Sequence, residues 1–192
     1  MSRSMKLTVA SLSFNIAFAV YHLVTGYLIR SWWLLTLGSY YLILSSIRFV
    51  VLQAKSKERF IMGFTGWMLM VLSIPLAGTV VLSVVRDRGQ KFHIIVMIAI
   101  ATYAFAKITI AAINLIKSRR STSCALISLR NISFADAFVS IFALQRSMLV
   151  SFDGMSEAEI VIMNAALGSA VCIACFLLGL LLLLNRQYKS SI

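Results

Sequence analysis

A single carboxylate, Asp136, stands in the middle of the stretch SCALISLRNISFADAFVSIFAL, which runs from Ser123 to Leu144. The stretch is almost wholly apolar and is long enough to cross a lipid bilayer as a helix. A charged side chain at the centre of a bilayer costs about 2.5–3.5 kcal/mol on insertion scales, so it requires a partner. Asp136 is therefore the first candidate functional residue, and the chemistry it offers is the binding of a cation or a proton.

The partner that the sequence offers is Lys107, which lies in the preceding apolar stretch. At about 1.5 Å per residue, Lys107 lies roughly 15 Å above the basic segment at 117–120, and Asp136 lies about 20 Å above it. A lysine side chain can cover that difference, so we predict a Lys107–Asp136 pair between consecutive antiparallel helices. Arg130 competes for Asp136, but its position six residues earlier turns it to another face of the same helix.

Other polar residues recur at helical spacing within the apolar stretches and are predicted to face the same centre. They build either a hydrogen-bond network that fixes the helix bundle or a pathway for a solute or ion. His22 is the only central histidine, so no metal site is predicted. The pathway candidates are Asn15, His22, Tyr40, Tyr103, Asn114, Ser133 and Ser140.

Composition indicates an integral membrane protein. Of the 192 residues, 60% are hydrophobic and only 12% are charged, whereas soluble domains have about 45–50% apolar and about 25% charged residues. The net charge of +12 comes from 18 basic and 6 acidic residues. Most basic residues fall in short gaps between apolar stretches and form no large basic face, so the lipid bilayer is the expected partner and nucleic acid is not.

The motifs of soluble enzymes are missing from the sequence. It has no glycine-rich phosphate loop, no metal-binding motif of the His-x-Glu type and no nucleophile with a neighbouring histidine and acid. An intramembrane protease would need two acids or a serine–histidine dyad, and Asp136 is the only acid in mid-membrane. We therefore expect no catalytic residues and no cofactor.

Six apolar segments predict an all-α, multi-pass membrane protein with one transmembrane domain over 1–192 and no soluble domain. The expected helices are at about 7–29, 32–53, 60–85, 93–116, 124–149 and 158–184. Ser156 and Glu159 have the spacing of a capping box, which predicts that the sixth helix begins there.

The distribution of basic residues predicts the orientation. Ten basic residues lie in the gaps on one side of the expected membrane, and four lie in the gaps on the other. This excess predicts a protein of the cell membrane with both termini in the cytoplasm. Arg48 and Arg146 lie near helix ends, where a long side chain can reach the membrane surface.

Two stretches resemble the transmembrane part of the cation diffusion facilitator family. NIAFAVYHLVTGYLIRSWWLLTLGSYYLIL, from Asn15 to Leu44, is similar to that family's first two helices, and SCALISLRNISFAD is similar to its fifth-helix motif, which leads to a metal-binding Asp. The resemblance implies six helices with both termini inside, and often a homodimer. The chain is also similar to uncharacterised six-helix membrane proteins of Gram-positive bacteria, through YYLILSSIRF and RNISFAD.

The metal site of the resembled family is degenerate in this chain. In that family, two ligands four residues apart lie on the second helix and two on the fifth. The matching positions here hold Tyr40, Leu44, Ile132 and Asp136. Zinc requires about four N, O or S ligands, which this set does not supply. Zinc transport is therefore not expected.

The functional expectation is a transporter-like membrane protein of unknown substrate, in which Asp136 couples to a proton or cation and Lys107 is its internal counter-charge. Two alternatives remain open. One is a scaffold or accessory subunit that transports nothing. The other is a substrate-binding subunit of a vitamin importer, which matches the chain in length and basic charge.

Overall fold

The computed structural model describes residues 3–53, 58–85, 94–118, 123–151 and 154–188, and at some helix positions, Asn114 among them, it describes the backbone alone. All regular structure in these ranges is helical. Every helix begins and ends within four residues of the boundary expected from the sequence. The helices are α1 (Arg3–Leu28), α2 (Trp32–Gln53), α3 (Glu58–Val85), α4 (Ile94–Ser118), α5 (Cys124–Ser151) and α6 (Glu157–Tyr188).

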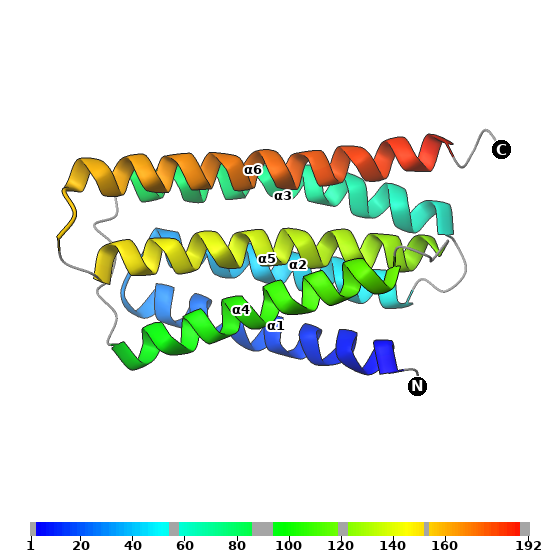
Figure 1. The fold of residues 1–192 in the computed structure, drawn as a ribbon, viewed down its shortest axis with the longest axis horizontal. Coiled ribbons are helices and arrows are strands. Elements are labelled where there is room, and N and C mark those ends of the chain that lie inside the picture. The colour runs from blue at the N-terminus through cyan, green and yellow to red at the C-terminus, as the bar shows by residue number, and fades with distance from the viewer. Residues whose placement is uncertain (1–2, 54–57, 86–93, 119–122, 152–153, 189–192) are drawn as a thin grey trace.

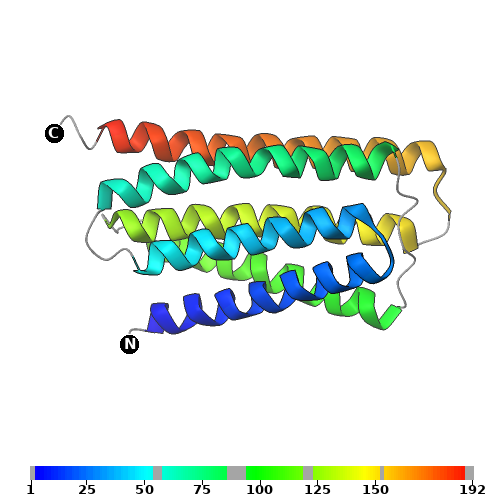
Figure 2. The same ribbon diagram turned by 180° about the vertical axis from the view of Figure 1, so that it is seen from behind.

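The six helices form three layers of two, with α2 and α5 in the middle layer (Figure 1). One outer layer holds α3 and α6, and the other holds α1 and α4; the view from behind shows the same order (Figure 2). Within their apolar spans, 56% of α2 and 50% of α5 is buried, against 33% of α3 and 28% of α6. Polar residues on α2 and α5 are therefore the ones that must find partners inside the bundle.

Helices pack against one another both between the layers and within them. α1 packs along α2, and α4 packs along α5, while α3 packs along α6 and also contacts both middle helices. The start of α1 and the end of α6 lie at the same end of the bundle (Figure 1). This arrangement is the one expected for six helices that alternate in direction.

The start of α6 has the capping box that the sequence predicts. The Ser156 hydroxyl accepts the Glu159 backbone N–H over 3.3 Å, and the Glu159 carboxylate accepts the Ser156 backbone N–H over 2.8 Å. These two bonds satisfy backbone donors that the first turn of a helix leaves free. Ser156 is therefore the residue that fixes the boundary of α6.

Two glycines bring α3 and α6 together. A Cβ atom placed on Gly66 would lie 2.9 Å from the Gly179 carbonyl oxygen, and one placed on Gly179 would lie 2.8 Å from the Gly66 carbonyl oxygen. Small residues of this kind let two helix backbones approach in a membrane, where packing replaces the hydrophobic effect as the driving force. The outer α3–α6 layer depends on this contact.

The exposed surface of the bundle is rich in large apolar side chains. Ile74 on α3 is 70% exposed and Ile162 on α6 is 66% exposed. Four helices, α2, α3, α5 and α6, are long and apolar enough to cross a membrane. In α1 and α4 the apolar stretches found among the described residues are shorter, Leu12–Leu28 and Ile100–Ile113.

Candidate functional site

Asp136 lies in the middle layer and is 2% exposed. Three side chains on three other helices donate hydrogen bonds to it: Asn15 Nδ2 from α1 to Oδ2 over 2.7 Å, Lys107 Nζ from α4 to Oδ1 over 2.5 Å, and Arg48 Nη2 from α2 to Oδ2 over 3.4 Å. The predicted Lys107–Asp136 pair is therefore present. These four residues, which we call the charged cluster, join four of the six helices.

The ammonium group of Lys107 is enclosed by aromatic rings as well as by the carboxylate. Its Nζ lies 4.4 Å from the centroid of the Tyr41 ring and 4.4 Å from the centroid of the Tyr103 ring. Cations are attracted to ring faces by about 0.5–2 kcal/mol, more where water is excluded. Lys107 itself is 7% exposed. We refer to Tyr41, Tyr103 and Asp136 together as the Lys107 cage.

Hydrogen bonds to neighbouring side chains orient the groups of the cage. The Tyr103 hydroxyl donates to Asn15 Oδ1 over 3.0 Å, which fixes the Asn15 amide with its nitrogen toward Asp136. Ser140 donates to the Asp136 backbone carbonyl over 2.8 Å, so the Tyr41 hydroxyl, 3.2 Å from Ser140 Oγ, is the donor in that contact. These hydrogen bonds thus hold the Tyr41 and Tyr103 rings and the Asp136 carboxylate in place around Lys107.

The expected positions of two arginines at the membrane surface are wrong. Arg48 is 2% exposed and contacts Asp136, although it lies only five residues before the end of α2. Arg146 is also 2% exposed, and its guanidinium carbon lies 4.5 Å from the centroid of the Trp33 ring. Both arginines lie on the middle helices, which are covered on both sides, so their side chains turn into the bundle. The charged pair is therefore a triad of Lys107, Asp136 and Arg48.

His22 and Tyr40 are buried, as expected of residues near the centre, but neither joins the charged cluster by a hydrogen bond. The His22 ring packs edge-on against Phe18, with ring centroids 4.4 Å apart. Within the part of the chain that the structure describes, neither His22 nitrogen has a hydrogen-bond partner, whereas the Tyr40 hydroxyl lies beside the Cys175 thiol of α6. Buried polar atoms without partners are uncommon in folded proteins, and a water molecule or an ion is one of the ways in which they are satisfied.

For two of the other candidates, Ser133 and Asn114, the structure describes no contact with the residues around Asp136. Ser133 is partly buried and donates to the Leu129 carbonyl of its own helix over 2.9 Å. The side chain of Asn114 lies outside the described residues. The hydrogen-bonded polar residues around Asp136 come from α1, α2, α4 and α5. They include Asn15, Tyr41, Tyr103 and Ser140.

The four positions that match the metal ligands of the resembled family lie in the core. Tyr40 and Leu44 on α2 and Ile132 and Asp136 on α5 are each at most 2% exposed. Three of them offer a metal no carboxylate, imidazole or thiolate. Among the described residues, no three His, Cys, Asp or Glu side chains lie close enough together to hold a metal ion.

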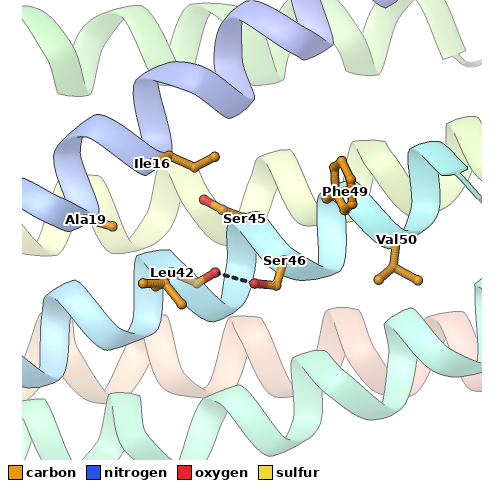
Figure 3. Close-up of a pocket in the computed structure, with 7 residues that line it drawn as sticks. All are labelled: Ile16, Ala19, Leu42, Ser45, Ser46, Phe49 and Val50. Atoms are coloured by element: carbon orange, nitrogen blue, oxygen red, sulfur yellow. Dashed lines mark hydrogen bonds between the residues drawn. The ribbon is translucent and has the colours of Figure 1, made fainter.

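A groove of about 340 Å³ lies between α1 and α2 (Figure 3). Its two serine hydroxyls are already used: Ser45 donates to the Tyr41 carbonyl over 2.8 Å, and Ser46 donates to the Leu42 carbonyl over 3.0 Å. The groove therefore suits an apolar chain and not an ion. It is lined by Ile16, Ala19, Leu42, Ser45, Ser46, Phe49 and Val50.

Sequence reasoning missed Arg48 and Tyr41 as members of this centre. One signal was present for Tyr41: it is the neighbour of Tyr40, and either residue can face the partner helix depending on how α2 is rotated. Phe18, which stacks on Tyr103 with centroids 4.2 Å apart, carries no polar group and gave no signal. These residues become recognisable only when the layers are known.

The fold and the surface define the class: this is an all-helical membrane protein with a buried charged cluster in its middle layer. No family model, no curated protein and no solved structure matches the chain.

Proposed function

We propose that the chain is a transporter-like protein of the cell membrane, with six spanning helices, both termini in the cytoplasm and Asp136 as the group that couples to a proton or cation. The observation that carries the proposal is the placement of Asp136: an acid with donors from three other helices, buried where a spanning bundle has its centre. Ionisable groups at such depth mark ion pathways and proton relays in membrane proteins.

The degenerate facilitator fold that the sequence resembles remains part of this proposal. It is supported by the adjacency of α2 and α5 and by the burial of all four positions that match the metal ligands. The missing ligands argue against zinc as the substrate. Lys107 supplies the positive charge that a metal would otherwise bring to Asp136.

The scaffold alternative has one observation in its favour, which is the completeness of the network around Asp136. Both carboxylate oxygens have donors, and Asn15 is bonded at both ends of its amide. A network of this kind also stabilises a bundle that transports nothing. The His22 ring nitrogens, which have no hydrogen-bond partner among the described residues, favour a centre that takes up a further group.

Uptake into proteoliposomes tests the transport proposal. Isotopically labelled Na⁺, Rb⁺, propylammonium and Zn²⁺ are the probes, and protein-free liposomes measure passive permeation. We expect protein-dependent uptake of at least one monovalent cation, and none of Zn²⁺. The Asp136→Asn/Lys107→Met variant, which neutralises the pair, is expected to fall to the passive level, whereas Glu157→Gln, at an exposed acid, is expected to retain uptake.

Two results would contradict the transport proposal. Absence of protein-dependent uptake for every probe would favour the scaffold. Equal uptake by the wild type and the neutralised variant would remove Asp136 from the mechanism.

Labelling of single cysteines tests the proposed orientation. After the three native cysteines are replaced by serine, cysteines introduced at Ser4 and Ser190 are expected to resist an impermeant maleimide in intact cells and to react after permeabilisation, because the basic gaps lie at that end. A cysteine at Gly154, in the turn before α6, is the opposite-side control. Labelling of either terminus in intact cells would show that the orientation or the number of spans is wrong.

A further inference from the structure

The two oxygens of Asp136 are engaged by different groups. Oδ2 accepts from Asn15 and contacts Arg48, whereas Oδ1 is engaged by Lys107. If the Lys107 side chain leaves its place, Arg48 still balances the charge of the carboxylate, and Oδ1 becomes an open acceptor. The open site then carries one negative and one positive charge among the described groups, so a monovalent cation restores the present charge and a divalent cation exceeds it.

The walls of that open site suit an organic cation. Two tyrosine ring faces lie 4.4 Å from the position of the ammonium nitrogen, and aromatic faces combined with a carboxylate recognise ammonium groups in proteins. The acceptor at Oδ1 favours a group with N–H donors. A bare alkali ion would meet only one carboxylate oxygen there, because the rings offer faces and not lone pairs.

We infer that the Lys107 cage is a binding site for the primary ammonium group of a small monovalent cation, and that the Lys107 side chain is its tethered occupant. This inference deepens the proposed function by naming the substrate class, and it rests on that function for its biological meaning. When a ligand binds, Lys107 gives one proton to water, its neutral amine leaves Oδ1, and the charge of the centre is unchanged.

Removing the tethered occupant gives a direct test. Lys107→Ala deletes three methylene carbons and the nitrogen, which are the heavy atoms of propylammonium. We expect propylammonium to raise the thermal unfolding midpoint of the purified variant in detergent, with a maximum at the propyl member of the methyl-to-hexyl series. Propan-1-ol, which has the same size without the charge, is expected to have no effect, and so is K⁺.

Matched variants separate the parts of the site. Adding Tyr41→Leu to Lys107→Ala is expected to weaken propylammonium binding roughly 2- to 30-fold, the range of one ring face. Adding Asp136→Asn is expected to abolish it. If propan-1-ol and propylammonium stabilise Lys107→Ala equally, the cage is an apolar cavity and the inference is wrong.

Binding of propylammonium to the wild type tests whether the site accepts a ligand while Lys107 is present. We expect propylammonium to bind it about tenfold or more weakly than Lys107→Ala at neutral pH, because Lys107 competes for Oδ1. Because binding releases the Lys107 proton to water, the wild-type affinity should rise between pH 6 and about 9, while that of Lys107→Ala stays constant; propylammonium itself keeps its charge there, as a free primary amine does.

The other groups that face the lysine nitrogen are Asp136 on α5, Arg48 and Tyr41 on α2, Asn15 and His22 on α1, and Tyr103 on its own helix. His22 carries the other ionisable ring nitrogens near this lysine, so His22→Gln is the control variant and must leave the pH dependence unchanged. A wild type that binds no propylammonium at any pH in this range would overturn the substrate class.

The outcomes of the binding and uptake experiments are distinguishable. Binding without any protein-dependent uptake would leave the ammonium site standing and remove the transport function. Asp136-dependent uptake of another cation, with no binding of propylammonium, would leave transport standing and overturn the ammonium site.

Discussion

Replacement of Asp136 by leucine is expected to lower the free energy of unfolding by about 3–5 kcal/mol. The change leaves Lys107 and Arg48 buried without the carboxylate that both contact, and it removes the acceptor of Asn15. Equilibrium unfolding in mixed micelles measures the effect. Glu157→Gln, which removes an exposed acid, is expected to change stability by less than about 0.5 kcal/mol.

The same measurement separates a pair from a triad. If Lys107 and Asp136 form an isolated pair, the Lys107→Met/Asp136→Leu double variant recovers the stability that either single change loses. Because Arg48 also contacts Asp136, we expect that double variant to recover only in part. Addition of Arg48→Met is expected to recover most of the remainder. A double variant as stable as the wild type would show that Arg48 does not depend on Asp136.

Replacement of Gly66 or Gly179 by leucine is expected to lower the free energy of unfolding by about 1–3 kcal/mol or more, which is typical of overpacking. The new side chain would meet the backbone of the facing helix, since even a Cβ atom lies within 2.9 Å of a carbonyl oxygen at each position. Backbone cannot move aside as a side chain can, so α3 and α6 must separate.

Disulfide crosslinking between cysteines placed at facing positions of α3 and α6, together with unfolding in micelles, measures that separation. Gly78 lies on α3 as well, and a Cβ there meets nothing within 4 Å, so Gly78→Leu is the matched control and is expected to be neutral in both measurements. Tolerance of Gly66→Leu equal to that of Gly78→Leu would show that the close α3–α6 contact is not required.

The helices were predictable because their boundaries depend on local properties of the chain. Apolar segments near membrane length and the basic or turn residues between them placed all six within four residues. The Lys107–Asp136 contact was predictable for a different reason. A buried acid requires a counter-charge, and consecutive antiparallel helices bring residues at equal depth together.

The rest of the centre depends on the packing of helices that are not consecutive. Arg48 appeared to be near a surface because depth along α2 was the only information available, whereas the covering of α2 by two layers turns it inward. The rotation of α2 is also a property of the whole bundle. It directs Tyr41, and not Tyr40, toward Lys107 and Ser140, a choice that helical periodicity alone leaves open.

Infrared spectroscopy of the purified protein with isotope-labelled aspartate tests the central claim most directly, since it reports whether Asp136 is charged. Comparison with Asp136→Asn isolates its signal from the two other aspartates in the chain, Asp87 and Asp153. With Lys107 as its counter-charge in the ligand-free protein, Asp136 of the wild type at neutral pH should show the bands of an ionised carboxylate, and Lys107→Met should shift part of them to a protonated carboxyl. A protonated carboxyl in the wild type, or a spectrum unchanged by Lys107→Met, would contradict the account.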